Sequence, residues 1–140
     1  MLAACETALP ADIFIAVAAV ADWRPDDCAD KKIKKGKSGI PALTLVENPD
    51  ILALVSTAKK RPELVIGFAA ETNDVVKHAK AKLAKKGCDW IVANDVSGDV
   101  MGGDHNAMIL VTAKSEDVFP RLKKEDAARR LAEKIAQFFH

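Results

Sequence analysis

An unbroken apolar segment, residues 13–21 (IFIAVAAVA), constrains the fold of this chain more than any other feature. A run of Ile, Val and Ala without polar alternation suits a β-strand buried on both faces, as in parallel sheets covered by helices. The run stops at Asp22, and a polar segment rich in lysine follows. Open parallel sheets bind ligands beyond the carboxyl ends of their strands. The sequence therefore predicts a ligand site with Asp22 at its rim and the lysine-rich segment above it.

The rest of the chain alternates between strand and helix. Asn48, with Pro49 at the first helical position, predicts a helix start, and Gly87 predicts a helix end. Gly67, inside an apolar run, predicts a close approach by backbone or ligand. The alternation predicts an α/β fold with a Rossmann-like, open, mostly parallel sheet flanked by helices. The expected strands are residues 13–21, 43–46, 63–72, 88–96 and 107–113, the expected helices are residues 2–9, 48–60, 72–86 and 125–138, and residues 23–40 are an expected surface loop.

The composition is that of a globular protein with one domain, which we expect to span residues 1–140. Hydrophobic residues make up 49% of the 140 residues and charged residues 29%, so the core needs no disulfide or metal. The net charge of +1 gives no global field for nucleic acid or for an anionic membrane. We expect neither as a partner, and any anion site must be local.

The cysteines indicate a reducing environment. Cys5, Cys28 and Cys88 are odd in number and lack a pairing or metal-ligand spacing. The three histidines share no ligand spacing either, so no metal site is expected. No apolar run reaches the roughly 20 residues that span a bilayer, and no signal peptide precedes the first helix. These features predict a cytoplasmic protein. Because the first helix starts without a cap or a preceding strand, we expect the chain to be part of a longer one.

Asp22 and the lysine cluster after it each have two interpretations. In the structural interpretation, Asp22 stabilises the turn before Trp23. In the functional one, its carboxylate accepts a hydrogen bond from a ribose hydroxyl or an amino group, or binds a divalent cation. The lysines either form a solvated surface or, because they repel one another, bind a polyphosphate. The cluster places four lysines within five residues: Lys31, Lys32, Lys34 and Lys35.

Two lysines of the helix predicted at residues 72–86 are candidates for the same site. At steps of 100° per residue, Lys82 and Lys86 lie beside or within the apolar stripe, unlike the other lysines there. Each must snorkel to solvent or meet a partner. Phe68 either packs in the core or stacks on a base. The chain has no GxGxxG sequence and no P-loop, so these residues belong to neither common nucleotide fingerprint.

Successive motifs along the chain resemble those of the phosphopantothenoylcysteine synthetase family: AAVADWRP, KKIKK, ENPDIL, GFAAET, KGCDWIVANDV and DHNAMILV. The resemblance implies a ligase that joins 4′-phosphopantothenate to cysteine. CTP would activate the carboxylate as an acyl-cytidylate and release pyrophosphate, and the cysteine amine would then attack. In bacteria this domain is commonly the C-terminal half of a bifunctional protein whose other half is a flavin-dependent decarboxylase. FMN would bind only to that other half.

The resemblance also assigns roles to residues of this chain. It implies that Asp22 binds the nucleotide and that Lys32 is the catalytic lysine, binding CTP and assisting the activated intermediate. Mg²⁺ would accompany CTP, and the family implies a homodimer. Further contacts with CTP are implied for Val46, Glu47, Asn48, Pro49, Phe68, Lys82 and Lys86.

The earlier half of the family's domain, with a glycine-rich phosphate-binding turn and an SSG segment, does not occur in this sequence. We therefore expect the sheet to lack its first strand or strands, and the chain to be unable to complete the reaction alone. Two alternatives stay open. One is an ATP-dependent version of the same ligase, and the other is a non-catalytic α/β nucleotide-binding or regulatory module.

Overall fold

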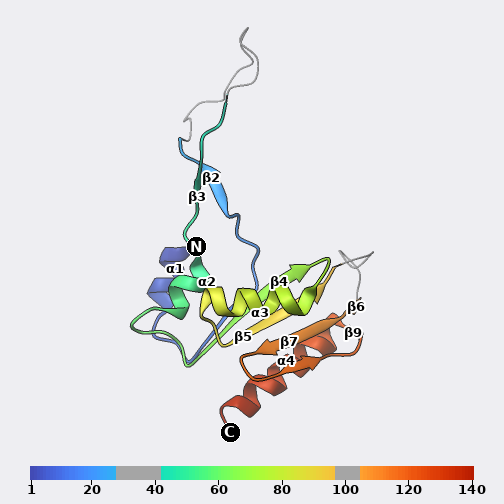
Figure 1. Cartoon of the computed structure of the whole chain (residues 1–140). Coiled ribbons are helices and arrows are strands. Elements are labelled where there is room, and N and C mark those ends of the chain that lie inside the picture. The colour runs from blue at the N-terminus through green and yellow to red at the C-terminus, as the bar shows by residue number, and fades with distance from the viewer. Residues whose placement is uncertain (28–41, 97–104) are drawn as a thin grey trace.

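A five-stranded sheet with helices on both faces forms the body of the molecule (Figure 1). The computed structural model describes residues 1–27, 42–96 and 105–140. The strand order is β1-β4-β5-β7-β8. The pairs β1–β4 and β4–β5 are parallel, whereas β5–β7 and β7–β8 are antiparallel. The predicted fold class is confirmed. The strands are β1 (Ile13–Ala16), β4 (Leu64–Glu71), β5 (Trp90–Asp95), β7 (Met108–Thr112) and β8 (Glu116–Val118).

The helices cover the sheet in two layers (Figure 1). One layer holds α1 (Leu2–Ala8), α2 (Ile51–Ser56) and α3 (Val75–Lys86), and the other holds α4 (Lys124–Phe138). Alternate residues of β4 and β5 point to opposite layers, so each strand contributes to two apolar clusters. The strands of the parallel core are therefore buried on both faces, as a parallel sheet requires. No helix among the described residues is long and apolar enough to cross a membrane.

The edge strand β1 differs from the prediction for residues 13–21. It ends at Ala16, and Ile15 and Val17 are 41% and 62% exposed. The expectation of a strand buried on both faces was wrong here, because β1 pairs only with β4. An unpaired edge, with little packed over it, leaves apolar side chains open to solvent.

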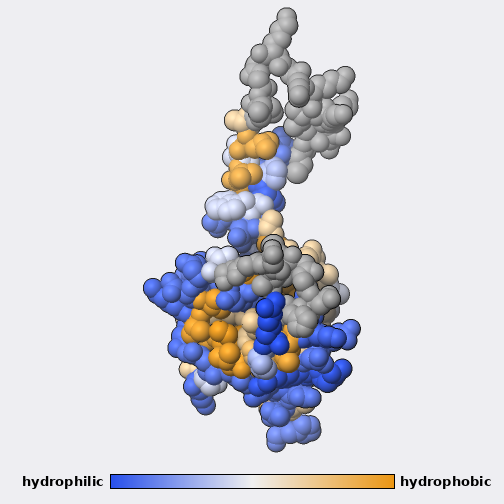
Figure 2. Space-filling view, turned by 90° about the vertical axis from the view of Figure 1, so that its right-hand side faces the viewer, coloured by the Kyte–Doolittle hydropathy of each residue, from blue (hydrophilic) through white to orange (hydrophobic). Residues whose placement is uncertain are grey.

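A two-stranded ribbon projects from the body (Figure 1). It pairs β2 (Trp23–Pro25) antiparallel with β3 (Leu45–Glu47). The prediction of an unstructured surface loop was wrong for β2, because a strand that pairs with one exposed neighbour needs no apolar pattern. Apolar side chains lie exposed along the ribbon (Figure 2). A second small ribbon pairs β6 (His105–Asn106) with β9 (Leu122–Lys123).

The start of α2 differs from the prediction by two residues. The N-cap is Asp50, whose Oδ1 accepts a hydrogen bond from the Ala53 N–H at 3.1 Å. Asn48 was predicted as the cap, but its Nδ2 instead donates to the Ala21 carbonyl oxygen at 2.8 Å. The helix ends at Ser56, earlier than predicted.

The helix α3 ends as predicted and starts later than predicted. Gly87 follows it with a φ of 67°, a left-handed conformation that glycine adopts without strain. Asp74 occupies the N-cap position and makes no side-chain capping bond there.

Gly67, at the centre of β4, confirms the predicted close approach. A Cβ atom at this position would lie 2.5 Å from Leu52 Cδ2 and 2.9 Å from Ile91 Cδ1. Leu52 comes from α2 and is buried. The lack of a side chain at Gly67 therefore lets α2 pack directly on the sheet.

We expect Gly67→Ala to lower the free energy of unfolding by about 1–3 kcal/mol, because the added methyl overpacks the contact with Leu52. In a Leu52→Ala background, which itself costs about 2–5 kcal/mol, the loss should shrink, since the methyl then fills vacated space. Urea denaturation of the single and double variants measures both effects. Gly87→Ala is the control: its cost of about 1 kcal/mol comes from backbone strain, so Leu52→Ala should not change it. Additive losses for residues 52 and 67 would contradict this account.

Candidate functional site

A cavity of about 1010 Å³ lies beside the carboxyl end of β1. Its wall includes residues 17–22, which follow β1, and the segment Asn48–Leu52, which enters α2. It extends past the edge strand on both sides, to α3 on one face of the sheet and to α4 on the other. A site at the strand ends was predicted, and the cavity occupies that place.

The structure brings most of the predicted site residues to this cavity. Val46 and Glu47 lie in β3, at the base of the projecting ribbon, and do not line it. Lys32 lies outside the described residues. The predicted residues that line the cavity are Asp22, Asn48, Pro49, Phe68, Lys82 and Lys86.

Both candidate lysines of α3 have specific partners. Lys82 Nζ donates to the carbonyl oxygen of Phe68 at 2.9 Å, and Lys86 Nζ forms an ion pair with Asp50 Oδ2. Simple snorkelling to solvent therefore does not describe either side chain. They reach the cavity because it passes the edge strand and continues over the face that carries α2 and α3. Two cationic groups thus lie one turn apart on its wall.

The carboxylate of Asp50 stays ionised at neutral pH. Partial burial raises its pKa, but the hydrogen bond and charge of Lys86, the Ala53 N–H and the charge of Lys85 together lower it below the usual value. Because the folded pKa is depressed, the pair stabilises the fold above the pKa of the unfolded chain. That contribution is lost as the pH falls through the folded value.

A hydrogen-bonded junction joins the ribbon to the segment after β1. Asn48 N–H donates to the Asp22 carbonyl oxygen, and Asn48 Nδ2 donates to the Ala21 carbonyl oxygen, each at 2.8 Å. Arg24 Nη1 donates to the Glu47 carbonyl oxygen at 2.8 Å and to Asn48 Oδ1 at 3.3 Å. Asn48 thereby fixes the backbone around Asp22. Sequence reasoning missed Arg24, because a single arginine in a polar segment carries no pattern.

Asn94, near the end of β5, also lines the cavity and was not among the predicted site residues. Its Oδ1 atom is buried and has no hydrogen-bond partner among the described residues. An unsatisfied buried oxygen is costly, so such an atom is a common mark of a functional region. The only sequence signal was its place at the exit of a predicted strand.

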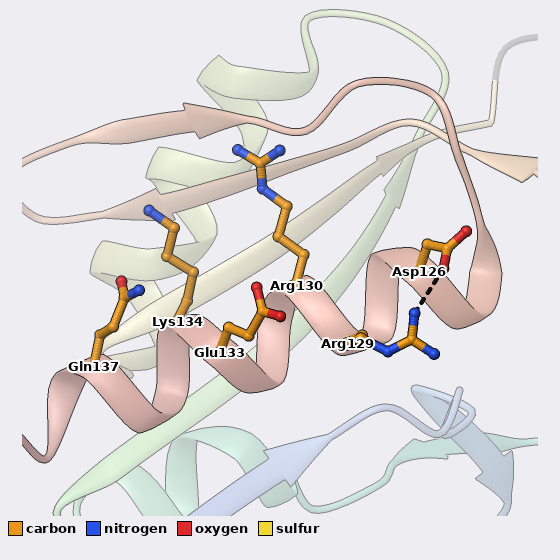
Figure 3. Close-up of a pocket in the computed structure, with 6 residues that line it drawn as sticks. All are labelled: Asp126, Arg129, Arg130, Glu133, Lys134 and Gln137. Carbon is orange, nitrogen blue, oxygen red and sulfur yellow. Dashed lines mark hydrogen bonds and ion pairs between the residues drawn. The ribbon is translucent and has the colours of Figure 1, made fainter.

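Another cavity, of about 250 Å³, lies along α4 (Figure 3). Its six lining residues all come from this one helix, and Asp126, Arg129, Arg130 and Lys134 form ion pairs. Arg129 pairs with Asp126 at 2.8 Å, and Lys134 pairs with Asp117 of β8 at 2.7 Å. Both are ordinary surface ion pairs, the first within α4 and the second between α4 and the sheet. This cavity is therefore a weak candidate for a ligand site.

Comparison with known proteins identifies relatives along almost the whole chain. Residues 1–139 match the family described as DNA/pantothenate metabolism flavoprotein C-terminal domain. The coenzyme A biosynthesis bifunctional protein CoaBC of Vibrio vulnificus is 42% identical over 127 residues, covering 89% of this chain and 32% of the relative. CoaBC of Escherichia coli K12 is 42% identical over 128 residues, with the same coverage of 89% and 32%. The chain thus spans 32% of the length of these relatives.

Solved structures of related proteins share the fold. A crystal structure of the C-terminal domain of CoaBC has a TM-score of 0.73 and 29% identity, covering 98% of this chain and 59% of that one. A variant of Cab2 in complex with phosphopantothenate-cysteine has a TM-score of 0.62 and 16% identity, covering 91% and 46%, and supports the fold alone. The resemblance found in the sequence motifs is confirmed. The chain belongs to the DNA/pantothenate metabolism flavoprotein C-terminal domain family.

Proposed function

We propose that the chain is the nucleotide-binding portion of a CTP-dependent ligase that joins 4′-phosphopantothenate to cysteine in coenzyme A biosynthesis. The observation that carries the proposal is the cavity, in which Asp22, Phe68, Lys82 and Lys86 meet from separate parts of the chain. The names of the CoaBC relatives, which are 42% identical to this chain, support the same pathway.

The cavity offers complementary groups for the parts of a nucleoside triphosphate. Lys82 and Lys86 would bind phosphate oxygens through charge-assisted hydrogen bonds. The Asp22 carboxylate would accept a hydrogen bond from the ribose or an amino group, and the Phe68 ring would contact the base. Val46 and Glu47 would contact CTP through their backbone atoms at the base of the ribbon. The hydrogen bonds of Asn48 and Arg24 hold that backbone in place.

Carboxylate activation concentrates negative charge around the α-phosphate and the acyl oxygen, so cationic side chains stabilise the transition state. We assign this catalytic role to Lys32 on the strength of the family motif alone. The attack of the cysteine amine on the acyl-cytidylate would then form the amide and release CMP.

Mg²⁺ would arrive with the nucleotide instead of occupying a protein site. No group of three or more metal-ligating side chains occurs within the described ranges. Mg²⁺ commonly binds substrate phosphates with few protein ligands, which fits a cavity whose carboxylates are Asp22 and Asp50. FMN would bind in a decarboxylase region and not in this cavity, because the cavity residues are assigned to CTP.

We further propose that the ribbon mediates a homodimer. On the ribbon, Trp23 and Leu45 are 54% and 52% exposed, and Leu43, just before β3, is 64% exposed. This arrangement is suited to burial against a second copy. The absence of nucleic-acid and membrane partners stays a prediction from the composition. The cytoplasmic location stays a prediction from the cysteine pattern.

Calorimetry tests the nucleotide assignment. We expect the chain to bind CTP more tightly than ATP, and Lys82→Gln to weaken CTP binding about tenfold or more through loss of a charged hydrogen-bond donor. Lys77→Gln, which removes an exposed lysine from the same helix outside the cavity, is the matched control and should bind like the wild type. Stronger binding of ATP would favour the ATP-dependent ligase. No nucleotide binding at all would favour a non-catalytic module.

Turnover is a separate test. We expect the 140 residues to bind CTP without releasing pyrophosphate when phosphopantothenate and cysteine are added. The open β1 edge and the 59% coverage of the solved CoaBC domain support a need for further residues of that domain. Coupled detection of pyrophosphate measures the reaction, with a full-length CoaBC as the positive control. Full turnover by the 140 residues would refute this expectation.

Sedimentation equilibrium tests the dimer. Leu45→Glu places a charge on the exposed ribbon and should raise the dimer dissociation constant at least tenfold. Val118→Glu, at a 65% exposed site on β8, is the control and should leave association unchanged. A wild-type chain that stays monomeric at high concentration would exclude the proposed dimer.

A further inference from the structure

The two lysines on the cavity wall are held in different ways. Lys82 donates to a neutral backbone carbonyl, that of Phe68, and forms no ion pair with a carboxylate of the described residues. Lys86 instead pairs with the Asp50 carboxylate. Its side chain is only 20% exposed. A long, flexible lysine side chain is thus fixed by one acidic residue from a different part of the chain.

Asp50 can fix Lys86 because its own conformation is fixed. One carboxylate oxygen, Oδ1, accepts the Ala53 N–H at 3.1 Å and caps α2. The other oxygen, Oδ2, pairs with Lys86 Nζ. The carboxylate therefore bridges the first turn of α2 and the last turn of α3. Both elements belong to the cavity wall, since Asp50 and Lys86 line it.

The Lys86 ammonium group can donate further hydrogen bonds to a ligand while it is paired with Asp50. It carries three N–H donors, and Asp50 is its one hydrogen-bond partner among the residues that the structure describes. Asp50 stays charged, because the charge and hydrogen bonds around it lower its pKa. The pair is therefore formed at neutral pH, and the ammonium is ordered before any ligand arrives.

We propose that Asp50 is a positioning residue for phosphate recognition: it holds the Lys86 ammonium on the cavity wall, where that group binds the polyphosphate of the nucleotide. The inference rests on the proposed function, which assigns a nucleotide to this cavity. It adds a residue that the family resemblance does not assign.

The Asp50 carboxylate affects polyphosphate binding in two opposing ways. A carboxylate near a polyphosphate repels it, so the charge of Asp50 opposes binding. Its benefit is order: a lysine that is already held loses less rotamer freedom when it meets the ligand. Removal of Asp50 should therefore weaken polyphosphate binding even though it makes the site more positive. A residue that acts only through net charge would have the opposite effect.

Asp50→Asn separates the two tasks of the side chain. Asparagine caps helices about as well as aspartate, so α2 should persist, while the ion pair is lost. We expect about tenfold weaker binding of CTP and of inorganic tripolyphosphate in calorimetry, and unchanged binding of CMP. Asp50→Ser, which also keeps a capping oxygen, should behave alike. Thermal unfolding confirms that each variant is folded.

A double-mutant cycle tests whether Asp50 acts through Lys86. Lys86→Gln should weaken binding of both polyphosphates, and adding Asp50→Asn to it should cost no more. Lys85→Gln, which removes the adjacent exposed lysine, is the charge-matched control and should leave the effect of Asp50→Asn intact.

The outcomes distinguish this inference from the proposed function. If tripolyphosphate binds and the cycle shows coupling, but CTP binds no better than tripolyphosphate, the positioning role stands and the CTP assignment fails. If Asp50→Asn binds as well as or better than the wild type, or if its loss persists undiminished with Lys86→Gln, the positioning role is overturned. Failure of the wild-type chain to bind either polyphosphate overturns both.

Discussion

Burial of β4 and β5 between two helical layers is the constraint on which the rest of this structure depends. Leu64, Ile66 and Ile91 have no exposed surface, and alternate side chains supply both apolar clusters. Burial of this kind dominates the stability of a domain. Because β1, β4 and β5 run parallel, their carboxyl ends meet at the same edge of the sheet, beside the cavity.

The elements that pack into this core could be predicted from sequence. The strands β4, β5 and β7 read as apolar runs, and Gly87 marked the end of α3 correctly. Where packing does not decide the structure, the predictions were weaker. The run after β1 has the same composition as a buried strand, yet the chain leaves the sheet after Ala16. The prediction failed here because composition does not reveal which strand lies at the edge of a sheet.

The site could be predicted in part. Asp22, Phe68 and the two α3 lysines were found because each interrupts a pattern or matches a family motif, and all four line one cavity. Their roles remain predictions. The contacts that organise them were not visible in the sequence: Asn48 bonds to Ala21, 27 positions away, and Lys86 pairs with Asp50, 36 positions away. Such long-range pairs depend on how the elements dock, which local periodicity does not encode.

The packing of Leu52 on Gly67 has a consequence for how this site can change. Leu52 lines the cavity and also occupies the space that a side chain at Gly67 would need. The volume available to a ligand and the integrity of the sheet therefore depend on the same side chain. A lineage that widened the cavity by shortening residue 52 would open a void in the core unless residue 67 grew at the same time. Widening of the cavity at residue 52 thus requires a paired substitution at residue 67 to keep the core filled.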